Sequence, residues 1–186
     1  MKVVTITGYK PFELGIFRPN DPAITIIKLA LEKEIRSLID EGVEWFLISG
    51  QLGIECWAAE VVYELQEEFP EVKLAVLTPF LNQEERWNEG NKELYEMILA
   101  QADFVSAISN TPYKTPKQFH NKNRIFLHKT DGVLIIYDEE KPGSPQYFLK
   151  EARKYKEKYS YLIRMITFYD LQLIVEEEQL RRQEES

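Results

Sequence analysis

The sequence predicts a single α/β domain of three layers, in which helices cover both faces of a mainly parallel sheet of five or six strands. Short runs rich in β-branched and aromatic residues alternate with longer segments of helical period, and this alternation is typical of βαβ units. Each short run is nearly all apolar, as expected of strands that are buried on both faces. The chain has 186 residues, of which 44% are hydrophobic, and this is enough for one continuous core.

Five apolar runs are predicted strands, and a sixth segment is a further candidate. They cover residues 2–7, 45–48, 73–77, 104–108 and 133–137, with 162–169 as the candidate. Helical periodicity marks residues 22–39, 54–68, 84–100, 119–129 and 146–159. The first helix has the clearest boundaries, because Asp21 can cap it, Pro22 suits its first position and Gly42 can end it. We expect one domain over residues 1–170 and a charged helical tail at 171–186.

The charge balance disfavours partners that carry negative charge. The chain has 31 acidic and 23 basic residues and a formal charge of -8, so its mean field repels nucleic acid and anionic membranes, although one local basic pocket can override this effect. No apolar stretch approaches the roughly 20 residues that span a bilayer. Cys56 is the single cysteine, and the N-terminus is too short and polar for a signal peptide. We therefore expect a cytoplasmic protein.

Polar residues follow each of the predicted strands. The carboxyl ends of parallel strands meet at one edge of a sheet, where ligands bind near the point at which strand order reverses. Such residues also make good turns, which is the alternative interpretation for any single loop. Their convergence on one edge favours a site there. The segments are Thr7-Gly8-Tyr9, Ser49-Gly50-Gln51, Thr78-Pro79-Phe80, Ser109-Asn110-Thr111 and Asp138-Glu139.

The loop after the second strand, residues 49–53, is the most informative of these segments. Gly50 allows a turn with positive φ, and Gly53 allows a ligand or a neighbouring strand to come close. The helix that follows presents unpaired amides and the positive end of its dipole, which suit a phosphate. Neither the G-x-G-x-x-G nor the G-x-x-x-x-G-K-[ST] fingerprint is present, so a simple tight turn remains an alternative.

Glu55 stands in the first turn of that helix. A carboxylate there is favourable beside the helix dipole, and this alone can explain its presence. In a binding site it could instead accept a hydrogen bond from a ribose hydroxyl or act as a general acid or base. Glu55 is thus the one candidate catalytic residue, should the protein be an enzyme.

The same segment resembles a known group of proteins. Ser49, Gly50, Gly53, Ile54 and Glu55, followed by Ala58-Ala59, resemble the loop-helix motif of the SLOG group, which includes DprA and the LOG (Lonely Guy) nucleotide hydrolases. Further segments over residues 1–170 resemble the YpsA family of Bacillus-type bacteria: Thr5-Ile6-Thr7-Gly8, Thr78-Pro79-Phe80, residues 83–91, 118–124 and 131–145. The resemblance implies a Rossmann-like fold that binds a nucleotide or an ADP-ribose-like derivative, with a link to cell division and hence a cell-division protein as a partner.

One motif departs from the LOG pattern. The LOG hydrolases carry a second motif, P-G-G-x-G-T-x-x-E, whose counterpart here begins at Pro142-Gly143-Ser144. Its second and third glycines are missing and its threonine is Tyr147, which argues against phosphoribohydrolase activity. Gly143 and Ser144 can still offer amides to an anion at the start of the next helix, as a second ligand contact.

Three further side chains are candidates for ligand contacts. Arg86 could hold a phosphate and Trp87 could stack on a base, with a surface ion pair and core packing as their respective alternatives. Arg124 resembles an arginine of DprA-like proteins and either reaches a phosphate or pairs with an acid. We expect no metal site, because His120 and His128 lack a cluster of further ligands, and no cofactor.

Two functions follow, and they differ in chemistry. The first is a sensor or regulator that binds a nucleotide-type molecule without turnover. The second is an enzyme that cleaves an N-glycosidic or phosphate bond, with Glu55 as acid or base and Arg86 or Arg124 stabilising charge. A third, DprA-like binding of single-stranded DNA, requires a basic groove that the composition does not indicate. A homo-oligomer remains open.

Overall fold

The computed structural model describes residues 1–186 and contains one sheet of six parallel strands. The order across the sheet is β4-β3-β2-β1-β5-β6. The predicted α/β class and parallel sheet are confirmed. The strands are β1 (Val3–Gly8), β2 (Trp45–Ile48), β3 (Lys73–Thr78), β4 (Phe104–Ala107), β5 (Gly132–Ile136) and β6 (Leu162–Ile166).

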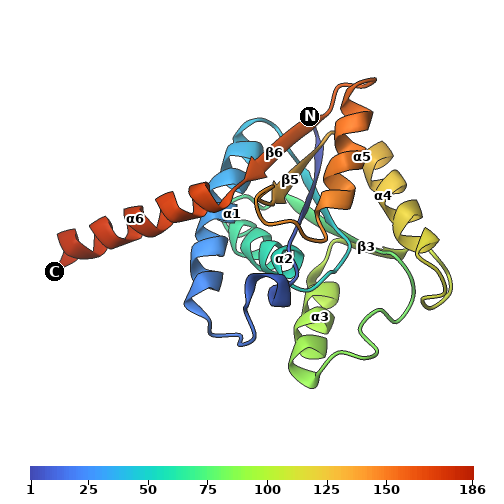
Figure 1. The fold of residues 1–186 in the computed structure, drawn as a ribbon, viewed down its shortest axis with the longest axis horizontal. Coiled ribbons are helices and arrows are strands. Elements are labelled where there is room, and N and C mark those ends of the chain that lie inside the picture. Colours follow the sequence, from blue (N-terminus) through green and yellow to red (C-terminus); the bar gives the residue numbers. More distant parts are fainter.

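Helices connect the strands and cover the sheet. α1 packs against α2 and α6, and α2 packs against α3, whereas α4 packs against α5. Figure 1 shows α1 and α2 on one side of the sheet and α4 and α5 on the other, with α6 extending away from the body of the domain. No helix is both long and apolar enough to cross a membrane. The helices are η1 (Pro11–Leu14), α1 (Pro22–Asp40), α2 (Ile54–Leu65), α3 (Glu89–Gln101), α4 (Lys117–Lys129), α5 (Gln146–Lys156) and α6 (Phe168–Glu185).

Local sequence signals account for the boundaries of α1. The Asp21 side chain accepts a hydrogen bond from the Ala23 amide at 2.9 Å, and Pro22 occupies the first helical position. After the helix, Gly42 has a φ of 103°, which a residue with a Cβ rarely adopts. The predicted start and end of this helix are confirmed.

Capping residues account for two of the differences from the predicted bounds. The helix predicted at 84–100 begins only at Glu89, since the Asn88 side chain accepts from the Asn91 amide at 2.8 Å and caps it. The candidate strand at 162–169 ends at Ile166. There Thr167 and Asp170 form a reciprocal capping box that starts α6.

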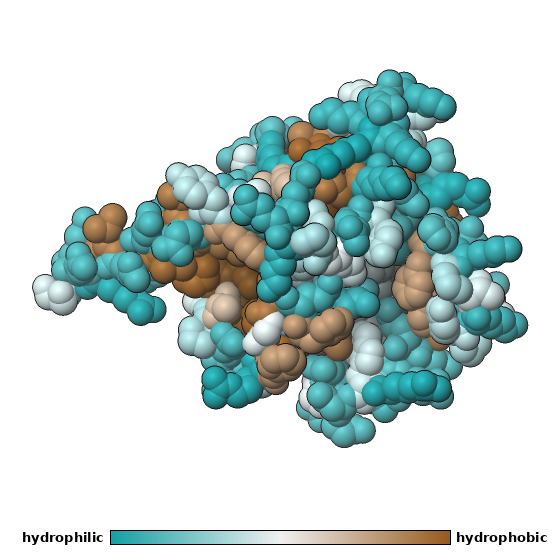
Figure 2. All heavy atoms as spheres, viewed as in Figure 1, coloured by the Kyte–Doolittle hydropathy of each residue, from teal (hydrophilic) through white to brown (hydrophobic).

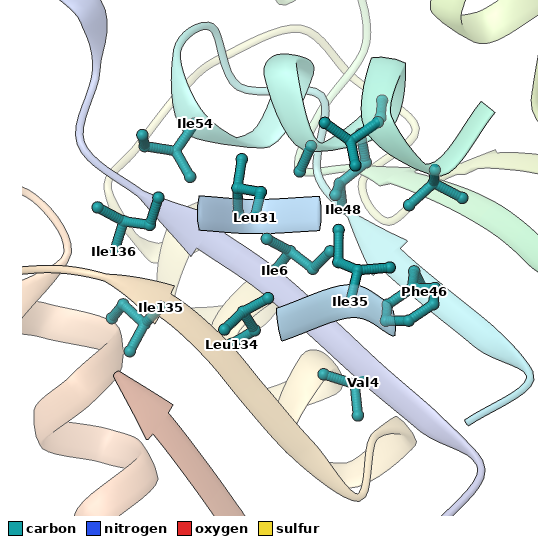
Figure 3. Close-up of a cluster of buried hydrophobic side chains, with 14 of the residues drawn as sticks. Val4, Ile6, Leu31, Ile35, Phe46, Ile48, Ile54, Leu134, Ile135 and Ile136 are labelled. Atoms are coloured by element: carbon teal, nitrogen blue, oxygen red, sulfur yellow. The ribbon is translucent and has the colours of Figure 1, made fainter. Parts of the chain in front are cut away.

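The main core lies between α1 and the central strands. Leu31 and Ile35 of α1 are fully buried and lie over Ile6 of β1 and Ile48 of β2 (Figure 3). Strand β4 is different, because Phe104 and Val105 are 53% and 44% exposed. The expectation that helices cover both faces of every strand is wrong for this strand, which stands at the edge of the sheet and has only one neighbour.

The strand order reverses between β1 and β5. The chain passes from β1 through β2 and β3 to β4 at one edge, and then returns to β5 on the other side of β1. β1 therefore has β2 on one side and β5 on the other, and the loops after these three strands meet at the carboxyl edge of the sheet. That edge is where a ligand site is expected in such folds.

Candidate functional site

Three of the predicted site residues come together at the carboxyl ends of β1 and β2. One oxygen of the Glu55 carboxylate accepts hydrogen bonds from the Ser49 amide at 2.7 Å and the Ser49 hydroxyl at 2.8 Å. The other oxygen accepts from the Thr7 hydroxyl at 3.0 Å. Glu55 is only 4% exposed, so this cluster ties β1, β2 and α2 together from within. Each carboxylate oxygen can accept about two hydrogen bonds, and the oxygen that faces Thr7 therefore keeps one free position.

The loop after β2 carries a series of backbone amides that donate to no protein acceptor. The Ser49 amide is held by Glu55, and the Ile54 amide donates to the Tyr9 carbonyl at 3.2 Å. No protein oxygen accepts from the others, which are those of Gly50, Gln51, Leu52, Gly53, Glu55 and Cys56. Unpaired amides at the first turn of a helix are favourable partners for an anion.

The two glycines of this loop are needed for different reasons. Both have positive φ, 85° at Gly50 and 95° at Gly53. A Cβ at Gly53 would lie 2.5 Å from the Tyr9 carbonyl and 2.9 Å from the Pro11 ring, so the segment that approaches Gly53 closely belongs to the protein. A Cβ at Gly50 would meet the Tyr95 ring and the Gln83 amide, which donates to the Ser49 carbonyl at 2.8 Å. Both glycines therefore set the shape of the loop.

The other side of β1 is filled by the protein's own side chains. Tyr9 is fully buried, and its hydroxyl lies 2.7 Å from the Lys141 carbonyl and accepts from the Asp138 amide at 2.9 Å. Burial raises the pKa of this hydroxyl. The ring lies against Tyr137 and Phe168, with centroid separations of 5.5 and 5.7 Å. The carboxyl ends of β1 and β5 are thus packed together.

An internal carboxylate occupies the turn that contains Gly143 and Ser144. Glu13 of η1 accepts from the Ser144 amide at 2.7 Å, from the Ser144 hydroxyl at 2.6 Å and from the Lys10 amide at 2.8 Å. Burial raises the pKa of Glu13, but these hydrogen bonds outweigh it and hold the pKa below its usual range. A Cβ at Gly143 would lie 2.6 Å from the same carboxylate. The anion held by this predicted second contact is therefore the protein's own Glu13.

The remaining predicted residues differ in burial and in contacts. Thr78 is buried at the end of β3, and Gln51 is partly exposed in the loop after β2. Arg86 and Arg124 are exposed and form no ion pair, so the ion-pair alternative does not explain either residue. The Trp87 ring packs edge-on against Tyr95 at a centroid distance of 5.1 Å, which fits the core-packing alternative. No group of three or more His, Cys, Asp or Glu side chains is arranged to hold a metal ion.

Lys122 is a candidate that the sequence did not identify. It lies on α4, half-buried, with its ammonium 5.4 Å from the Phe126 ring centre and 5.9 Å from that of Phe148. Burial lowers the pKa of this ammonium, and the carboxylates of Glu55 and Glu151 offset part of that effect. Lys122 makes no ion pair, so a half-buried positive charge is electrostatically coupled to Glu55 without a direct partner. Its position is set by the packing of α4 against α5, and no local sequence motif predicts this packing.

Comparison with known proteins identifies the family of this chain. A sequence model of the YpsA family, described as the YspA SLOG family, matches residues 4–171. The chain belongs to the YpsA family. Among its relatives, a UPF0398 protein of Bacillus pumilus (strain SAFR-032) is 59% identical over 178 residues, which cover 96% of this chain and 94% of the relative. A UPF0398 protein of Bacillus velezensis is 56% identical and covers 96% of this chain and 98% of the relative.

A solved structure shares the fold of this YpsA family member. It is DNA processing protein A from Helicobacter pylori, described with respect to its single-stranded DNA binding mode. The two structures align with a TM-score of 0.51 and 21% identity, over 86% of this chain. The alignment spans 64% of the DNA processing protein, so this chain corresponds to about two thirds of that protein. At this level of identity the likeness establishes the Rossmann-like fold.

Proposed function

We propose that this YpsA family member is a cytosolic protein that binds a nucleotide or a nucleotide derivative such as ADP-ribose. The ligand lies against the loop 49–53, on the β2 side of β1, and the protein acts as a sensor or regulator. The single observation that carries this proposal is the set of six unpaired amides at the start of α2, those of residues 50–53, Glu55 and Cys56. Such amides lower their free energy when they gain an anionic acceptor, because a buried donor without a partner is costly.

Charge and hydrogen-bonding capacity near this loop fit the two ends of a ribose phosphate. Lys122 supplies a positive charge that makes no ion pair, and an anionic ligand would give it a partner. The Glu55 oxygen that faces Thr7 has capacity for one further hydrogen bond, which a ribose hydroxyl can donate. A phosphate at the amides and a hydroxyl at Glu55 support a ribose phosphate as the ligand, and the family resemblance adds the nucleobase.

Sensing is favoured over hydrolysis by the state of Glu55. Its carboxylate is buried and already accepts three hydrogen bonds, which fix its orientation. This suits a fixed hydrogen-bond acceptor better than a group that must gain and lose a proton. The hydrolase remains the alternative, and it predicts release of a free base or ribose phosphate that is abolished by Glu55→Gln.

Titration calorimetry with AMP, ADP, ADP-ribose and adenosine tests the proposal. We expect the phosphate-bearing ligands to bind, adenosine to bind at least about ten times more weakly, and chromatography to show each ligand unchanged after incubation. A ligand at a hundred times its dissociation constant should also stabilise the fold by about 2.7 kcal/mol in a thermal denaturation assay. The absence of binding by all four compounds would contradict the proposal.

The link to cell division comes from the family resemblance, and we propose a division protein as the partner that reads the liganded state. A Bacillus strain that carries only the Lys122→Met variant provides the test. We expect it to show the same change in cell length as a strain without the protein, at an unchanged protein level. Normal cell length in the variant strain, with an altered length in the deletion strain, would separate ligand binding from division.

A further inference from the structure

The segment between Asp103 and Asp131 contrasts with the acidic composition of the chain. It contains Lys114, Lys117, Lys122, Arg124 and Lys129 and no aspartate or glutamate, although the whole chain has a formal charge of -8. The segment covers β4, the following loop and α4. A positive region of this kind can attract a polyanion that the mean field of the protein repels.

Exposed aromatic side chains stand within this positive segment. Tyr113 and Phe119 are 51% and 41% exposed. Both rings contact Phe80 of the loop after β3, with centroid separations of 5.3 and 5.5 Å, and they lie 5.9 Å from each other. Figure 2 shows a narrow apolar strip bordered by hydrophilic side chains over the loops that join β3 to α3 and β4 to α4. We call Tyr113, Lys114, Lys117, Phe119 and Arg124 the α4 rim.

A buried amide side chain holds the loop of the α4 rim in one conformation. The Gln118 oxygen accepts from the amides of Lys114 at 2.6 Å and Thr115 at 3.1 Å. The Gln118 nitrogen lies 3.1 Å from both the Ser109 hydroxyl and the Pro112 carbonyl. The loop therefore presents Tyr113 and Lys114 to solvent without the entropic cost of ordering a flexible segment on binding.

The cations of the α4 rim are free to meet an external anion. Lys114, Lys117 and Arg124 are exposed, and none of them forms an ion pair. Several cations elsewhere are paired within the protein, for example Arg36 with Glu32 and Glu68, and Arg153 with Glu139. Free cations beside exposed rings, on one fixed loop and the helix α4 that follows it, are complementary to a ligand that carries both phosphates and accessible base faces.

We propose that the α4 rim binds single-stranded nucleic acid without sequence preference. Unpaired bases stack on Tyr113 and Phe119, and the backbone phosphates contact Lys114, Lys117 and Arg124. A duplex is excluded from this mode, because its base faces are already stacked and only its phosphates remain available. The α4 rim includes neither the loop 49–53 nor Lys122, so this inference does not rest on the proposed nucleotide site.

Fluorescence anisotropy with a labelled twelve-residue oligo(dT) tests the inference. We expect saturable binding at 50 mM salt that weakens at 200 mM, with a log–log salt slope of about -2 for three phosphate contacts. The double variant Lys114→Gln/Lys117→Gln should reduce this slope to about -0.7. The matched control is Lys150→Gln/Lys154→Gln on α5, which removes the same charge elsewhere and should leave the affinity within about twofold.

Stacking is tested separately at Tyr113. Tyr113→Ala should weaken binding by about tenfold, and Tyr113→Trp should restore it, since a larger ring can still stack. Because Tyr113 is exposed, thermal denaturation should confirm that both variants fold. Equal behaviour of an RNA oligo(U) would support the same surface, since stacking needs no 2′-hydroxyl.

Four results would overturn the inference. They are no binding at 50 mM salt, equal affinity for a duplex of the same length, an equal loss in the α5 control, and displacement of the oligonucleotide by AMP at concentrations that saturate the nucleotide site. The last result would place the aromatic rings in that site instead.

Discussion

The two sides of β1 differ in how the protein treats the carboxyl ends of its strands. Toward β5, Tyr9 fills the space, and Glu13 takes the donors of Ser144. Toward β2, the loop after Ser49 leaves six amides without acceptors, and the Lys122 ammonium of α4, which is electrostatically coupled to Glu55, has no ion-pair partner. One half of the edge is satisfied internally, whereas the other half has unused donors and charge.

This difference moves the expected site by one strand. Ligands in open α/β sheets bind where strand order reverses, which here is between β1 and β5. That position is occupied by the protein's own ring and carboxylate, so the remaining donors lie between β1 and β2. Topology therefore determines which edge of the sheet can hold a ligand, and local side chains determine which part of that edge remains open.

Gly53→Ala is expected to have the largest effect on stability. Gly53 lies where the loop after β2 meets the segment after β1. Positive φ and a Cβ 2.5 Å from the Tyr9 carbonyl should together destabilise the fold by about 3 kcal/mol in chemical denaturation. Gly90→Ala on α3 is the control, because its Cβ has 3.6 Å of clearance and alanine favours a helix. Equal stability of the two variants would contradict the assigned role of Gly53.

Glu55→Ala should have the next largest effect, since it leaves the donors of Thr7 and Ser49 without their shared acceptor. We expect a loss of about 2 kcal/mol of unfolding free energy. Glu55→Gln should retain most of the stability, because its oxygen still accepts from Ser49 and its amide can donate to Thr7. If both variants lost the same amount, the carboxylate would act through its charge and the hydrogen-bond account would fail.

Lys122→Met tests whether the Lys122 charge contributes to binding of the ligand phosphate. The variant should bind AMP about tenfold more weakly, a change of about 1.4 kcal/mol, and should bind adenosine unchanged, because only AMP carries the phosphate. Lys129→Met, on the same helix and exposed, serves as the control in calorimetry. An equal loss for both ligands would assign Lys122 to the fold.

Glu13→Gln tests the β5 side of β1 and should cause the smallest loss of unfolding free energy, about 1 kcal/mol at pH 7. The folded pKa of Glu13 lies below 4.5, so its stabilising contribution is present above pH 4.5 and is lost as the pH falls through the folded value. Wild type should therefore lose more stability than the variant between pH 6 and pH 3, as measured by urea denaturation. If the stability of wild type and variant changed equally with pH, the ionised Glu13 carboxylate would not stabilise the fold.

Part of the site could be predicted from the sequence because its signals are local. Ser49, Gly50 and Glu55 lie within one turn and helix start, and the pairing of β1 with β2 brings Thr7 beside them. Residues that act across long separations gave no such signal. Glu13 and Ser144 are 131 residues apart, and their contact depends on how η1 packs on the loop after β5.

Lys122 and Gly53 show two other limits of sequence reasoning. α4 is rich in polar residues, so its sequence does not reveal that Lys122 lies against Phe148 of α5 or that its charge is coupled to Glu55. The glycine at position 53 correctly indicated a close approach, but only the fold shows that the approaching segment is Tyr9 to Pro11. Motifs identify local backbone geometry, whereas packing determines what fills the space.

A two-dimensional amide NMR titration with ADP-ribose and with AMP distinguishes ligand binding on the β2 side of β1 from binding on the β5 side, because each amide gives its own signal. If the ligand binds at the loop 49–53, we expect the largest chemical-shift changes at Gly50, Gln51, Leu52 and Cys56. Small changes are expected at Lys10, Asp138 and Ser144. Shifts concentrated at Lys10 and Ser144 would show that the ligand displaces Glu13 and enters the β5 side, and that result would contradict the account.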